Sequence, residues 1–117
     1  MGQKRAWIGR VDGLSYWRSE WHATTDDPRA FGIAVLVQGL YARPAPPASA
    51  LSFSIVDRGD EVVVSALDAS VTLRPAVEAY RDVDQVMWPS SLATAREWLA
   101  ARQNAAPSGD GPEVTPP

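Results

Sequence analysis

The chain has 117 residues, no cysteine and a formal net charge of −3. This length predicts one domain with a sizeable core, and the lack of cysteine excludes disulfides, thiolate nucleophiles and cysteine-based metal sites. Two of the 14 acidic residues, Asp110 and Glu113, lie in residues 104–117, which hold no base, so residues 1–103 carry 11 basic and 12 acidic residues. Such a nearly neutral domain lacks the basic surface of a nucleic-acid binder, and no nucleic-acid partner is expected.

The N-terminal stretch MGQKRAWIGR is charged and lacks the apolar segment of a secretory signal. The longest apolar run, FGIAVLVQGLYA, has 12 residues, whereas a helix that crosses a bilayer needs about 20. We therefore expect a soluble, cytoplasmic protein with no membrane partner.

The first predicted element is a strand over residues 15–23, SYWRSEWHA, where aromatic and polar residues alternate. One face of this strand would hold Trp17, Ser19, Trp21 and Ala23. The other face would hold Tyr16, Arg18, Glu20 and His22. A helix would also place Trp17 and Trp21 together, since they are four residues apart. The two indoles either belong to the core, or form a platform for a partner or a stacked ligand.

Two loops flank the next predicted strand. Residues 24–30, TTDDPRA, have turn chemistry, with Asp27 biased away from helix by Pro28. Residues 31–41, FGIAVLVQGLY, are mostly apolar on both alternating faces, and we predict a central strand covered on each side. Residues 43–50, RPAPPASA, hold three prolines and must run outside the sheet.

The next segment predicts a β-hairpin. Leu51, Phe53 and Ile55 alternate with serines, residues 57–60 (DRGD) form the turn, and residues 62–66 form the returning strand. After a turn at Leu67–Asp68, residues 69–73 add another short strand.

Beyond Pro75 the spacing of apolar residues changes from that of a strand to that of a helix. Residues 75–88 place Val77, Tyr80, Val83 and Met87 on one helical face. Pro89 ends that helix, and residues 91–104 form a second one with Leu92, Ala95, Trp98 and Leu99 on its inner face. We therefore predict an α+β fold, with an antiparallel sheet of four to six strands and two C-terminal helices packed on one face. Residues 1–103 would form a single domain, and the proline- and glycine-rich residues 104–117 a disordered tail.

His22 is the single histidine and the side chain best suited to acid–base chemistry near neutral pH. Glu20, Asp26 and Asp27 are near it in sequence, but no nucleophile motif accompanies it. No glycine-rich phosphate motif is present, and one histidine without cysteines leaves only oxygen donors for a metal, so we expect no cofactor and no metal. Arg58-Gly59-Asp60 is explained by turn chemistry alone.

These observations favour a small non-catalytic protein-binding module of the inhibitor, immunity, anti-defence or adaptor type, bacterial or phage-encoded. Its five tryptophans and its arginines are residue types that anchor interfaces. The expected partner-binding residues are Trp17, Trp21, Arg18, Tyr16 and His22. The partner would be another protein, and a homodimer is a further option. The alternative is a small-ligand-binding protein or enzyme, with a pocket between sheet and helices that uses His22 and nearby carboxylates.

Overall fold

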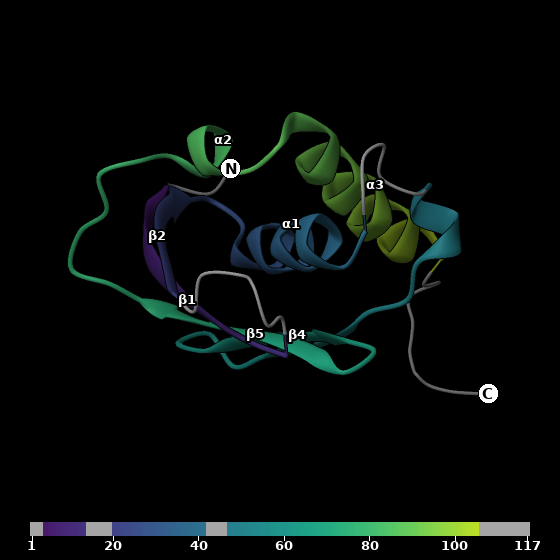
Figure 1. Cartoon of the computed structure of the whole chain (residues 1–117), viewed down its shortest axis with the longest axis horizontal. Coiled ribbons are helices and arrows are strands. Elements are labelled where there is room, and N and C mark those ends of the chain that lie inside the picture. The colour runs from purple at the N-terminus through teal and green to yellow at the C-terminus, as the bar shows by residue number, and fades with distance from the viewer. Residues whose placement is uncertain (1–3, 14–19, 42–46, 106–117) are drawn as a thin grey trace.

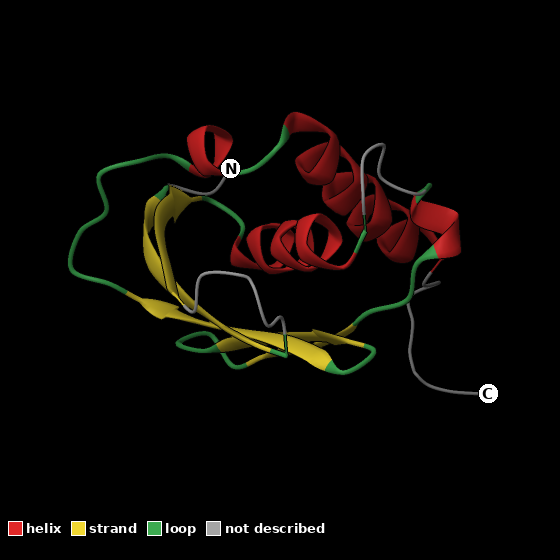
Figure 2. Ribbon diagram, in the orientation of Figure 1, coloured by secondary structure: helices red, strands yellow, loops and turns green. Residues whose placement is uncertain are grey.

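The computed structural model describes residues 4–13, 20–41 and 47–105. Its sheet consists of strands β1 (Arg5–Asp12), β2 (Glu20–Thr25), β3 (Ser54–Asp57), β4 (Val62–Ala66) and β5 (Ala69–Pro75). The strand order is β2-β1-β5-β4-β3, and all neighbours pair antiparallel. The helical elements are α1 (Pro28–Leu40), a 3₁₀ turn η1 (Ala48–Ala50), the single turn α2 (Val83–Val86) and α3 (Pro89–Ala105). The predicted α+β class, with two helices covering one face of an antiparallel sheet, is confirmed (Figures 1 and 2).

One of those two helices is where a strand was predicted. Residues 31–41 fall almost entirely in α1, which begins at Pro28 and is capped by the Asp27 side chain, an acceptor for the backbone N–H groups of Arg29 and Ala30. Helix α1 packs on β4 and β5 with one side and on α3 with another (Figure 1). Every residue from Ala30 to Gln38 is consequently buried. A run that is apolar all round fits a buried helix as well as a central strand, and here the helix forms.

The helix predicted over residues 75–88 is largely wrong. Strand β5 continues through Pro75, which pairs with Trp7, and the Ala76 N–H then donates to the carbonyl of Ala6 at 2.9 Å. The chain is therefore extended where the helix was expected to begin, and only Val83–Val86 turn helically. Val77 and Tyr80, predicted on the inner face, are exposed.

Strand β1 was not predicted at all. Its residues Trp7, Gly9 and Val11 face the helices and are buried, whereas Arg10 and Asp12 are exposed on the opposite face. It lies between β2 and β5, so it joins the predicted aromatic strand to the predicted hairpin region. The alternation is present in the sequence, but Gly9 interrupts its apolar side.

The hairpin and the last helix are confirmed. Strands β3 and β4 pair as expected, and Gly59 in their turn has a φ of 85°, a conformation that glycine adopts without strain. Strand β5 follows the turn at Leu67–Asp68. Helix α3 buries Leu92, Ala95 and Leu99, and it extends to Ala105, two residues into the predicted tail. Residues 106–117, the rest of that tail, lie outside the described part of the chain.

Candidate functional site

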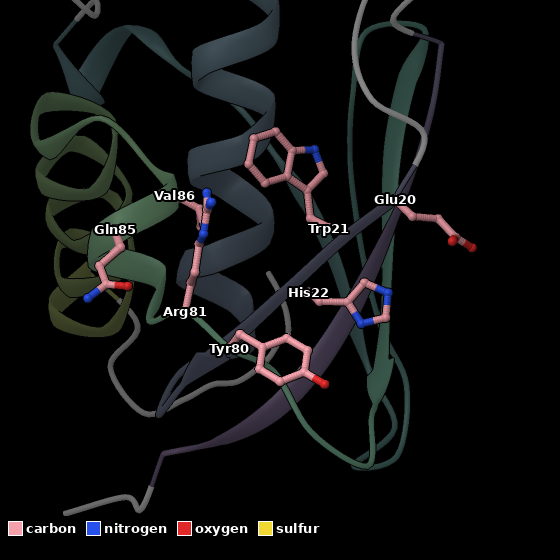
Figure 3. Close-up of a pocket in the computed structure, with 7 residues that line it drawn as sticks. All are labelled: Glu20, Trp21, His22, Tyr80, Arg81, Gln85 and Val86. Atoms are coloured by element: carbon pink, nitrogen blue, oxygen red, sulfur yellow. The ribbon is translucent and has the colours of Figure 1, made fainter.

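Strand β2 positions the side chains that the sequence singled out. Its antiparallel pairing with β1 sends Trp21, Ala23 and Thr25 to the helical side of the sheet. Glu20 and His22 point to the opposite side, as the two-residue period predicts (Figure 3). Trp21 is half-buried and packs against the hydrophobic core, whereas His22 is exposed.

Only part of the predicted site can be placed. Of the five predicted partner-binding residues, Trp21 and His22 are in β2, while Tyr16, Trp17 and Arg18 lie outside the described residues. The expectation that Trp17 shares a face with Trp21 therefore stays a prediction.

A groove runs beside the outer edge of β2. It has a volume of about 450 Å³. Its lining residues come from β2 and from the segment that leads into and forms α2, namely Glu20, Trp21, His22, Tyr80, Arg81, Gln85 and Val86 (Figure 3). The groove thus brings two of the predicted site residues together with Tyr80 and Arg81, to which sequence reasoning gave no site role.

Residues 76–82 form the outer part of this site and are held at both ends. At one end Ala76 donates to the carbonyl of Ala6, and at the other the Thr24 N–H donates to the carbonyl of Arg81, both at 2.9 Å. Ala6 and Thr24 face each other in the β1–β2 ladder, so both ends are attached at the same level of the sheet. Between its attachments the segment projects past β2 (Figure 1).

Asp82 strengthens the second attachment. Its carboxylate accepts a hydrogen bond from the Thr24 hydroxyl and lies 3.5 Å from the Lys4 ammonium. The Thr24 hydrogen bond, followed by the positive charge of Lys4, lowers the pKa of Asp82 below its ordinary value of 3.8. The carboxylate is therefore ionised at neutral pH and holds the loop to the edge of β2.

His22 lines the groove although its imidazole is on the face of β2 away from α1 and α3 (Figure 3). Glu20 of the same strand and Gln85 and Val86 of α2 also line it, so the predicted ligand pocket between sheet and helices stays a prediction. Asp27, one of the carboxylates near His22 in sequence, caps α1 instead. Within the described residues, no group of three or more histidine, aspartate or glutamate side chains is placed to hold a metal ion.

Comparisons with protein-family models, with curated proteins and with solved structures find no match for this chain. Among the described residues, no helix has the length and apolar character needed to span a membrane. Proposals about function therefore rest on the geometry of the β2 groove and its loop.

Proposed function

We propose that this protein is a non-catalytic binding module that acts by occupying the surface of another protein, in the manner of an inhibitor, an immunity or anti-defence protein, or an adaptor. The observation that carries the proposal is the pair of exposed side chains on the loop of residues 76–82. The relative exposure of Val77 is 101%, and that of Tyr80 is 88%.

Isolated exposed apolar residues are common and need no explanation. Here, however, Val77 and Tyr80 are three positions apart on a segment whose two ends are hydrogen-bonded to the sheet. A loop that is already held in place loses less conformational entropy on binding than a free one. Such a loop is suited to present an aromatic anchor to a partner.

The residues next to the loop have matching chemistry. Tyrosine, tryptophan and arginine are the side chains that most often dominate the binding energy of protein interfaces. Tyr80, Trp21 and Arg81 all line the same groove. The loop and the groove together would thus provide an exposed anchor beside a recess that can accept side chains of the partner.

The test compares a loop variant with a matched surface variant. Val77→Ser combined with Tyr80→Ser removes both exposed apolar groups, whereas Val56→Ser removes one from β3, where Val56 is 47% exposed. Both changes are at exposed positions, so we expect each to alter the free energy of unfolding by no more than about 0.5 kcal/mol.

Each immobilised protein is then exposed to lysate of the native host, and captured proteins are quantified by mass spectrometry. We expect a partner that the wild type and Val56→Ser retain and the loop variant loses by at least about tenfold, the effect of losing a hot-spot residue. Equal capture by all three proteins, or no capture by the wild type, would refute the proposal.

A further inference from the structure

The edge of β2 carries backbone groups that point away from the sheet. In an antiparallel ladder, residues alternate between pairs that exchange hydrogen bonds and pairs that do not. The Thr24 N–H donates to the carbonyl of Arg81, on the side of β2 away from β1. The carbonyl of Ala6, which faces Thr24, accepts from Ala76 on the side of β1 away from β2. Thr24 and Ala6 are therefore a pair that exchanges no hydrogen bonds. By alternation, the N–H and C=O groups of His22 and Glu20 also point to the outer edge.

This edge already accepts an extended segment at one position. Thr24 forms a parallel bridge with Asp82, so the backbone of residues 81–82 occupies the place of a neighbouring strand there. Beside Glu20 and His22 no described residue continues this pairing. The space next to them is the groove lined by Trp21, Arg81 and Val86 among others. Within residues 4–13, 20–41 and 47–105, the strand position next to Glu20 and His22 is therefore unoccupied.

We propose that an extended segment of a partner protein fills this position by pairing with the edge of β2 at Glu20–His22, and that an acidic side chain of that segment binds Arg81. The inference rests on the proposed function and specifies its mode of recognition. Strand addition of this kind obtains affinity from backbone hydrogen bonds and specificity from alternate side chains.

The lining of the groove defines the chemistry of that segment. Arg81 is exposed and forms no ion pair with any described residue, so a carboxylate is its natural complement. Trp21 and the half-buried Val86 offer apolar contact area for a neighbouring side chain. We therefore expect an extended sequence that combines an acidic and an apolar residue.

The same geometry disfavours a second copy of this chain as the occupant. The accessible edge consists of the three residues from Glu20 to His22, which at roughly 3.3 Å per residue is about 10 Å of strand. Beyond it, Arg81 and Asp82 cover Thr24, and residues 76–82 project past the strand. A covered and irregular edge hinders pairing between two sheets, whereas a single extended segment fits the groove.

The decisive comparison is His22→Pro with His22→Ala. Proline removes the outward N–H without breaking the ladder to β1, because that N–H does not bond to β1, and proline is tolerated at sheet edges. Alanine removes the same imidazole and keeps the N–H. The probe is a set of synthetic peptides selected on the wild-type protein from a phage-displayed library of random linear sequences.

We expect fluorescence anisotropy to show affinity at least about tenfold weaker for His22→Pro than for His22→Ala, since with proline a buried partner carbonyl loses its donor. In the wild type, NMR hydrogen exchange should show the amides of Glu20 and His22 gaining protection when the peptide binds. This second measurement needs no variant. A library that yields no binder, or binders that protect neither amide, would overturn the inference.

The charge of Arg81 gives an independent check. Arg81→Glu should weaken binding of an acidic peptide about fivefold, in the range of exposed ion pairs, and exchange of the peptide's acid for lysine should restore it. Sedimentation showing a homodimer that His22→Pro dissociates would overturn the choice of occupant. Host-partner capture that depends on Val77 and Tyr80 but not on His22→Pro would leave the proposed function standing and exclude the strand-addition mode.

Discussion

Gly32 marks the closest approach of helix α1 to the sheet, and its replacement by alanine tests that packing. A Cβ atom at this position would lie 2.7 Å from Val64 Cγ2 and 3.0 Å from Leu73 Cδ1. Both neighbours are completely buried. The contact at 2.7 Å is shorter than carbon atoms tolerate, so either the helix or the side chain of Val64 must move.

Two effects of opposite sign determine the stability of Gly32→Ala. Alanine favours a helix interior over glycine by about 1 kcal/mol, whereas overpacking a well-packed core costs about 1–3 kcal/mol. We expect net destabilisation of about 1 kcal/mol, which lowers the urea midpoint by roughly 0.5 M for a slope of about 2 kcal/mol/M. The measurement is urea unfolding followed by tryptophan fluorescence.

A double-mutant cycle with Val64→Ala isolates the contact. The single change Val64→Ala should cost about 2 kcal/mol, because it removes buried methyl groups and leaves a cavity. In the double variant the contact at 2.7 Å with Val64 Cγ2 is absent, and only the less severe approaches to Leu73 Cδ1 at 3.0 Å and to the Cβ atom of residue 64 at 3.2 Å remain. The two costs should therefore fall short of additivity by about 1–3 kcal/mol. Additive effects, with Gly32→Ala alone stabilising by about 1 kcal/mol, would refute the described approach of α1 to β4.

Three further predictions concern single contacts. Gln38→Met removes the acceptor for the backbone N–H of Trp88, bonded at 2.7 Å, and should lower the unfolding free energy in urea by about 1–3 kcal/mol; no loss would contradict the role of Gln38. Asp27→Ala removes the cap of α1 and should cost about 1 kcal/mol in the same assay, with Asp27→Asn as the control that keeps most of it. In an NMR titration of carboxyl carbons, Asp82 should titrate below its ordinary pKa of 3.8, and Thr24→Val should raise that pKa because the hydroxyl donor is lost. Since the folded pKa is lowered, the contribution of Asp82 to stability is present above the ordinary value and disappears as the pH falls through the folded pKa. A Thr24→Val titration identical to the wild type would contradict this cause.

The misassignment of α1 shows which signals in the sequence decide between strand and helix. Residues 31–41 are apolar in every direction, so their periodicity cannot separate the two. The decisive signals are local and lie just before the run, where Asp27 can cap a helix and Pro28 can occupy its first turn. The length of α1, 13 residues, also exceeds that of most strands.

The opposite error at residues 75–88 has a non-local cause. The helical spacing of Val77 and Tyr80 is present in the sequence, but β5 continues through Pro75 because that residue pairs with Trp7 of β1. Strand β1 had no predicted role, and without it nothing indicated that the chain remains extended. Tertiary pairing therefore overrides local periodicity here.

The candidate site likewise combines features that depend on adjacent residues with features that depend on residues distant in the sequence. The directions of Trp21 and His22 follow from the alternation of β2 and were predictable from adjacent residues. The position of Asp82 beside Thr24, which is 58 residues earlier in the chain, was not predictable, because it depends on how residues 76–82, which follow β5, reach the outer edge of β2.

The path of residues 76–82 explains why only a short part of the β2 edge is open to a partner. Exposed edges invite uncontrolled pairing, and proteins commonly cover them with loops or charges. Residues 81–82 cover the edge at Thr24, while Glu20 and His22 remain accessible beside the groove. A covered edge of this kind hinders pairing with a second sheet and leaves room for a single extended segment, which is the mode of recognition proposed above.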